Sequence, residues 1–135
     1  MDDSNGWACP WVYVSNGQTF ERRTEILRNM RGSDQERTET TPIGSVMNVD
    51  GSIVIKVTEE KDEVSYIDSL YLVIDGVAIA AQAESAAAAR IAAVDGDYLI
   101  LHRGQSYEFR FPVPRSWHDQ QPASVVVTGY YTAGD

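Results

Sequence analysis

Hydrophobic and polar residues alternate along several short stretches of this chain. Residues 52–58 place aliphatic side chains on one face and polar side chains on the other, and residues 107–111 repeat the pattern with aromatic rings. Residues 70–74 and 125–131 follow it as well. A period of two is typical of β-strands that bury one face. The pattern therefore predicts antiparallel strands over these stretches.

Two further stretches are continuously apolar. Residues 11–14 carry no charged side chain, and residues 98–101 read Tyr-Leu-Ile-Leu. A short apolar run without alternation is consistent with a strand buried on both faces. Both runs are predicted to be strands, and the pattern of residues 98–101 allows burial on both faces.

Turn-forming dipeptides separate the predicted strands. Asn and Asp followed by Gly tolerate the positive φ angles of tight hairpin turns. Four such dipeptides, and a fifth that is weaker, are Asn16-Gly17, Asp50-Gly51, Asp75-Gly76, Asp95-Gly96 and Arg103-Gly104. Short strands with closely spaced turns predict an all-β fold, here an antiparallel β-sandwich of about seven to nine strands.

Some segments do not follow the strand pattern. Residues 20–31 fit either a helix or a strand near residues 19–22 followed by irregular chain, and the strand is favoured. The alanine-rich stretch 78–93 favours one short helix over residues 85–92. Residues 32–42 are polar and charged and are predicted to be a surface loop. Length agrees with one domain: residues 1–8 are predicted to be an N-terminal tail, 9–131 the sandwich and 132–135 a C-terminal tail.

Charge narrows the choice of partners. Eleven basic residues against twenty acidic ones give a net charge of −9. Nucleic acids and anionic membranes are bound by basic surfaces, so neither is expected as the main partner. No apolar run approaches the ~20 residues of a membrane-spanning helix, so no transmembrane segment is expected. The charged run 59–63 is predicted to be a solvated connection.

Candidate catalytic and metal-ligating residues are few. The single cysteine, Cys9, excludes an internal disulfide, and the two histidines, His102 and His118, show no spacing that ties them to it or to each other. The carboxylates around Asp95-Gly96 are more simply explained as a turn than as a calcium loop. No catalytic residue, metal site or cofactor is predicted. A buried Cys9 is favoured over a thiol nucleophile.

Aromatic residues near the chain ends and in loops are the strongest binding candidates. Trp7, Trp117 and Tyr130 are predicted to contact a partner, because exposed Trp and Tyr are favoured at protein and carbohydrate interfaces. The alternative is that the first and last strands pair and bury the cluster. A carbohydrate-binding module would require Trp7, Trp11 and Trp117 to lie coplanar on one exposed face.

The opening of the chain resembles a known type of domain. Cys9-Pro10, an aromatic strand and Asn16-Gly17 followed by an aromatic residue are similar to the start of uncharacterised β-rich domains in bacterial extracytoplasmic proteins, secreted or lipoprotein-type. The similarity continues through residues 36–38, 49–51, 58–60, 66–68 and 95–101. It implies an accessory or surface module outside the cytoplasm, in the periplasm or at the cell surface, and carries over no activity. Residues 1–6 lack the pattern of a secretory signal, so the chain is expected to be cytosolic, already processed or part of a longer protein.

The function expected from these features is a non-enzymatic interaction or structural module of a bacterial extracytoplasmic or cell-surface assembly. It would bind a protein partner or a second copy through aromatic surfaces and strand edges. The alternatives are a carbohydrate-binding module and a small hydrolase that uses Cys9.

Overall fold

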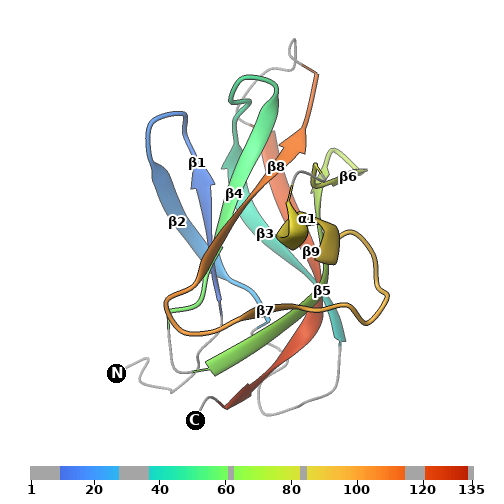
Figure 1. Ribbon diagram of the computed structural model, residues 1–135. Coiled ribbons are helices and arrows are strands. Elements are labelled where there is room, and N and C mark those ends of the chain that lie inside the picture. Colours follow the sequence, from blue (N-terminus) through green and yellow to red (C-terminus); the bar gives the residue numbers. More distant parts are fainter. Residues whose placement is uncertain (1–9, 28–36, 61–62, 83–84, 115–120, 134–135) are drawn as a thin grey trace.

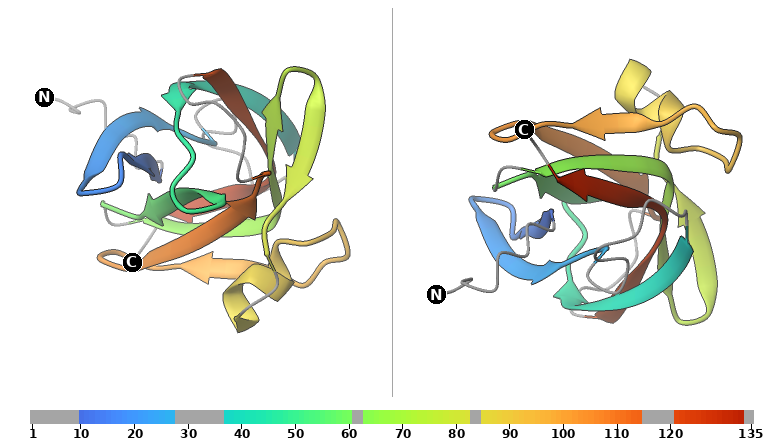
Figure 2. Two further views of the ribbon diagram at one scale, coloured as in Figure 1. Left: turned by 90° about the horizontal axis from the view of Figure 1, so that it is seen from above. Right: turned by 90° about the horizontal axis from the view of Figure 1, so that it is seen from below.

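The computed structural model describes residues 10–27, 37–60, 63–82, 85–114 and 121–133. Two antiparallel sheets pack face to face, and one short helix lies beside them (Figures 1 and 2). The predicted β-sandwich with a short alanine-rich helix is confirmed. The expected N-terminal tail, residues 1–8, falls outside the described residues, and the last strand continues through Ala133.

The first sheet has the strand order β2-β1-β4-β8. Its members are β1 (Trp11–Ser15), β2 (Phe20–Glu25), β4 (Ser52–Thr58) and β8 (Ser106–Pro112). The strand favoured near residues 19–22 is therefore present as β2. The predicted alternation also holds, because Phe109 and Phe111 are buried while Glu108 and Arg110 are exposed.

The second sheet has the order β3-β9-β5-β6, and β7 also pairs with β5. Its members are β3 (Arg37–Val46), β5 (Glu63–Ile74), β6 (Val77–Ala80), β7 (Leu99–Leu101) and β9 (Gln121–Ala133). The long central strand β5 pairs with β9 over nearly its full length, while β7 and β6 occupy successive parts of its other edge. The strand β9 therefore lies in the other sheet from β1, and the alternative in which first and last strands pair is wrong.

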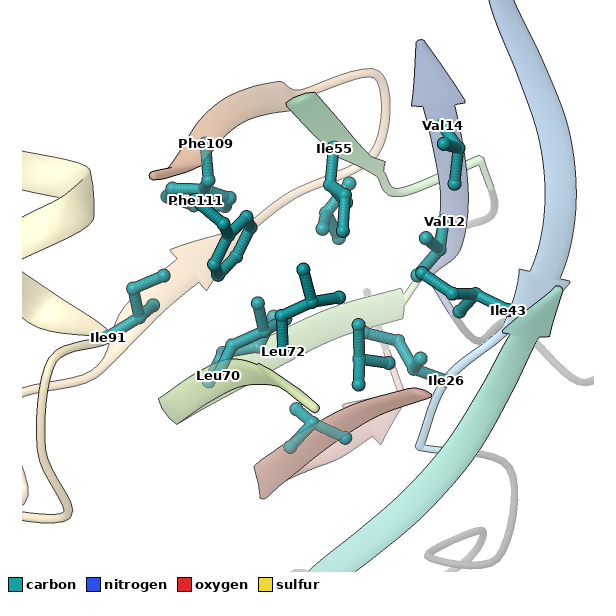
Figure 3. Packing of buried hydrophobic residues seen from close by; sticks show 14 of the residues in the cluster. Val12, Val14, Ile26, Ile43, Ile55, Leu70, Leu72, Ile91, Phe109 and Phe111 are labelled. Carbon is teal, nitrogen blue, oxygen red and sulfur yellow. The ribbon is translucent and has the colours of Figure 1, made fainter. Parts of the chain in front are cut away.

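The core lies between the sheets and is made of aliphatic residues and two phenylalanines. Ile53 and Ile55 of β4 pair with Phe111 and Phe109 of β8, and all four side chains are fully buried or nearly so (Figure 3). Leu70 and Leu72 meet them from the second sheet (Figure 3). Burial of a large apolar side chain contributes about 1.5–3 kcal/mol relative to exposure, so this layer holds the sheets together.

The helix α1 (Ala86–Arg90) begins where the sequence predicted. Ser85 caps it, since its Oγ accepts a hydrogen bond of 3.1 Å from the backbone N–H of Ala88. Ala88 and the following Ile91 are buried in the core, and the Ile91 carbonyl accepts a hydrogen bond from the Leu70 N–H. Helix α1 is therefore fixed against β5.

Tight turns occur at the predicted dipeptides; the turn at Asp75-Gly76 joins the paired strands β5 and β6, whereas the turn at Asp50-Gly51 leads from β3 to β4 in the other sheet. Asp50 and Gly51 have φ angles of 55° and 90°, and Asp75 and Gly76 have 53° and 77°. These left-handed conformations explain why Asp and Gly stand there. Asp95-Gly96 forms a turn as well, but it connects α1 to β7 and is not the hairpin that the pattern predicted.

Three interpretations of the sequence differ from the structure. Residues 37–42 belong to β3 and are not a loop, because β9 supplies backbone partners for this polar segment. Ile100 is 40% exposed, so β7 is buried on one face only. Glu59 is completely buried, and its Oε1 accepts a hydrogen bond of 2.5 Å from Ser65 Oγ, so the charged run does not begin in solvent.

Candidate functional site

Of the three predicted contact residues, the structure describes one. Trp7 and Trp117 lie outside the described residues, as do Cys9 and His118. Tyr130 lies on β9, half-buried, on the side of the second sheet that faces away from the core. His102 is exposed in the turn between β7 and β8.

Tyr130 belongs to a cluster of three tyrosines, which we call the tyrosine cluster. Its ring stacks on that of Tyr66 from β5, with centroids 4.6 Å apart and planes 10° apart. The Tyr98 ring meets both edge-on, at 5.5 Å from Tyr130 and 6.2 Å from Tyr66. Both arrangements are favoured by the ring quadrupole. Sequence analysis missed Tyr66 and Tyr98. The alternation of Tyr66 with buried Ser65 and Ile67 was the signal that placed it on the outer face.

The tyrosine cluster lies on an outer sheet surface that carries no charged side chain at the described outward positions. These positions alternate with core residues along each strand. The residues of this neutral face are Thr38 and Thr40 of β3, Ser124, Val126, Thr128 and Tyr130 of β9, Tyr66, Ser69, Tyr71 and Val73 of β5, Ala78 and Ala80 of β6, and Ile100 of β7. Within this face Ser69, Val126 and Thr128 are already buried by their neighbours, and the other side chains are half-buried or exposed.

Charged residues of the same strands turn away from the neutral face. Glu39 of β3 accepts a hydrogen bond of 2.6 Å from the backbone N–H of Leu27, a core residue. Asp68 lies at a bulge in β5 and is 1% exposed. Its Oδ1 accepts hydrogen bonds of 3.2 and 3.1 Å from the backbone N–H groups of Asp95 and Gly96. Asp68 thus fixes the turn before β7.

The outer surface of the first sheet differs in kind. There cations lie over aromatic rings: the Arg22 guanidinium is 3.6 Å from the Trp11 ring centroid, and Lys56 Nζ is 4.8 Å from that of Tyr13. Glu60 connects these two cation–ring pairs, since it accepts a hydrogen bond from Tyr13 OH and forms an ion pair of 2.5 Å with Arg22. The rings on this side already have partners within the chain.

Tyr13 offers a pH-dependent test of this arrangement. The hydrogen bond to Glu60, with burial and the carboxylate charge adding to it, raises the pKa of Tyr13 above its ordinary value of 10.0. Protonated Tyr13 therefore stabilises the fold below about pH 10, and this contribution is lost as the pH rises through the folded pKa. We expect Glu60→Gln to lower the pKa of Tyr13 towards 10.0 in an ultraviolet titration of tyrosinate, with Tyr13→Phe identifying its signal.

Asp75→Asn is the matched control, because it removes one negative charge from a hairpin of the other sheet. It should leave the Tyr13 transition in place. If Glu60→Gln left the tyrosinate titration unchanged, the hydrogen bond would not control this phenol.

The described residues contain no group of three or more His, Cys, Asp and Glu side chains that could hold a metal ion. They also contain no helix long and apolar enough to cross a membrane. The neutral face is suited to apolar contact and to neutral hydrogen bonds.

Comparisons with protein family models, with curated proteins and with solved structures give no match to this chain.

Proposed function

We propose that this protein is a non-enzymatic structural module that associates with a second copy of itself through the neutral face. The observation that carries the proposal is the absence of charge from the described outward positions of the second sheet, in a chain of net charge −9. The cores of protein interfaces are depleted in charged residues and enriched in aromatic ones.

The proposed contact residues lie on three adjacent strands of this face, β7, β5 and β9. Ile100 pairs with Tyr66 across β7 and β5, and Tyr66 pairs with Tyr130 across β5 and β9. A 40% exposed isoleucine thus lies beside the tyrosine cluster. Tyrosines are frequent at the centres of interfaces because they are large, rigid and amphipathic. Association would remove the exposed parts of these side chains from water.

The salt dependence of association distinguishes a second copy from a partner of opposite charge. Two copies, each with nine excess negative charges, repel one another where acidic surfaces approach. That repulsion is weakest where the neutral faces meet, and salt screens what remains. Association should therefore strengthen as salt is added, whereas binding driven by opposite charges would weaken. The resemblance of the opening strand supports an extracytoplasmic assembly as the place of this association.

The tyrosine cluster does not favour the carbohydrate alternative. A platform for a sugar ring needs aromatic faces that lie side by side and open to solvent. Tyr66 and Tyr130 stack on each other, and Tyr98 stands nearly perpendicular to both. A carbohydrate-binding module would also need coplanar tryptophans. Two of these, Trp7 and Trp117, lie outside the described residues.

The experiment is light scattering over a range of protein and salt concentrations. We expect the wild-type chain to form a dimer, and we expect Thr40→Glu and Ile100→Glu each to weaken dimerisation at least about tenfold. Each substitution places one carboxylate from each copy in the dimer interface. Both residues are exposed, so each variant should keep its fold by circular dichroism.

Gln18→Glu is the matched control. It adds the same charge at an exposed turn of the first sheet and should dimerise like the wild type. A wild-type chain that stays monomeric at every concentration and salt level would overturn the proposal. So would a dimer that Thr40→Glu and Ile100→Glu leave as tight as before.

A further inference from the structure

A hollow of about 310 Å³ opens at the side of the sandwich, between α1 and β7. Its walls are Ala86, Ala87 and Arg90 of α1, Leu99 and Ile100 of β7, and the rings of Tyr98 and Tyr107. The volume is at the small end of the range of about 300–1,000 Å³ that is typical of small-molecule sites. Apart from Arg90, every lining side chain is aliphatic or a tyrosine.

The hollow exists because the helix presents alanines to it. Ala88 and Ile91 anchor α1 in the core, and the hydrogen bond from Leu70 N–H to the Ile91 carbonyl holds the end of the helix against β5. Ala86 and Ala87 line the hollow, and their small methyl groups leave space in front of β7, although Ala87 also packs against the core. The walls are thus positioned by buried contacts before any ligand enters.

Arg90 is the one charged residue among those that line the hollow. Its side chain is 47% exposed, and its Nη1 donates hydrogen bonds of 3.2 Å to Asp97 Oδ1 and 3.3 Å to the Tyr98 carbonyl. Asp97 is 62% exposed. Exposed ion pairs contribute only about 0–1 kcal/mol. A second carboxylate can therefore compete with Asp97 for this guanidinium, which is able to bind a carboxylate through two parallel hydrogen bonds.

We propose that this hollow is a binding site for a small apolar carboxylic acid. The apolar part lies against the alanines, Leu99 and Ile100, and the carboxylate pairs with Arg90. This assignment follows from one cation at an apolar hollow, a combination that matches a ligand with one acidic and one apolar end. It does not depend on self-association, although Ile100 contributes to both surfaces.

The test is calorimetric titration with 3-phenylpropionate, and with the neutral alcohol 3-phenylpropanol for comparison, at a pH where the acid is ionised. We expect the acid to bind with a dissociation constant of about 1 mM or tighter. The alcohol should bind at least about fivefold more weakly, because it cannot form a charged pair with Arg90.

Variants separate the parts of the site. Arg90→Gln should weaken binding of the acid at least about tenfold, whereas Asp97→Asn should strengthen it about threefold by removing the competing carboxylate. Ala86→Phe should fill the hollow and abolish binding while circular dichroism shows the fold retained. Arg103→Gln, an exposed arginine in the turn after β7, is the control and should change nothing.

Binding of the alcohol as tightly as the acid would overturn the assignment, as would unchanged affinity in Arg90→Gln. A wild-type chain without saturable binding at millimolar acid would also overturn it. The same titration is repeated with Thr40→Glu, in which the neutral face is disrupted. This variant should bind the acid like the wild type. A wild-type chain that binds the acid but stays monomeric would therefore contradict the proposed function alone.

Discussion

Gly129→Ala is expected to lower the free energy of unfolding by about 3 kcal/mol or more. A Cβ atom at this position would lie 2.2 Å from the backbone oxygen of Tyr66 and 3.2 Å from the Cα of Ile67. Both are main-chain atoms of β5, beside the bulge where the register with β9 shifts. They cannot move aside without separating the two longest strands of the second sheet. Urea denaturation measures the change.

Gly17→Ala is the matched control for this steric effect. Gly17 has a φ of +92°, and no atom lies within 4 Å of the place that a Cβ would take, so alanine there meets conformational strain but no clash. We expect a loss of about 1 kcal/mol. Equal losses in the two variants would show that backbone freedom, and not close approach of β5, explains Gly129. The Gly129→Ala substitution would also displace part of the neutral face, because Tyr130 follows Gly129 directly.

Asp68→Ala is expected to lower the free energy of unfolding by about 2–3 kcal/mol. The buried carboxylate accepts hydrogen bonds from the backbone N–H groups of Asp95 and Gly96, and the second of these also reaches Oδ2 at 3.3 Å. Alanine leaves both N–H groups without this acceptor and removes the tie between the β5 bulge and the turn before β7. Hydrogen exchange at the two amides should accelerate more than exchange elsewhere in β5.

Asp97→Ala controls for the loss of a carboxylate in the same segment. Its side chain is 62% exposed and pairs with Arg90 at the surface, so the expected change is within about 0.5 kcal/mol. If the loss in Asp68→Ala were equally small, water would serve as acceptor for the two backbone N–H groups of the turn as well as the buried carboxylate does. The role of Asp68 in positioning β7 would then be wrong.

The tyrosine cluster shows how far local sequence information reaches in a binding surface. Tyr130 was predicted as a contact residue from its aromatic character and its place near the chain end. Its partners lie 64 and 32 residues earlier, at Tyr66 and Tyr98. Their proximity depends on the pairing of β5 with both β9 and β7, which no local pattern specifies.

Glu59 and β3 show where local polarity misleads. The acidic run predicted solvent exposure, yet Glu59 is buried beside Ser65 because the chain turns from β4 towards β5 at that point. Residues 37–42 looked like a loop, since a polar edge strand and a polar loop have similar compositions. Only the hydrogen-bonding groups of β9 distinguish them.

By itself the sequence determined the class of fold, the tight turns at Asp50-Gly51 and Asp75-Gly76, the inward residues of most strands, and the helix that Ser85 caps. These features depend on residues that are neighbours in the chain: alternation along a strand, positive φ in a turn, and a cap three residues from its donor. Tertiary structure alone decided the strand order, the bulge at Asp68, the neutral face and the hollow beside α1. Each of these joins residues far apart in sequence, and their approach is set by the packing of whole sheets, where many weak contacts act together.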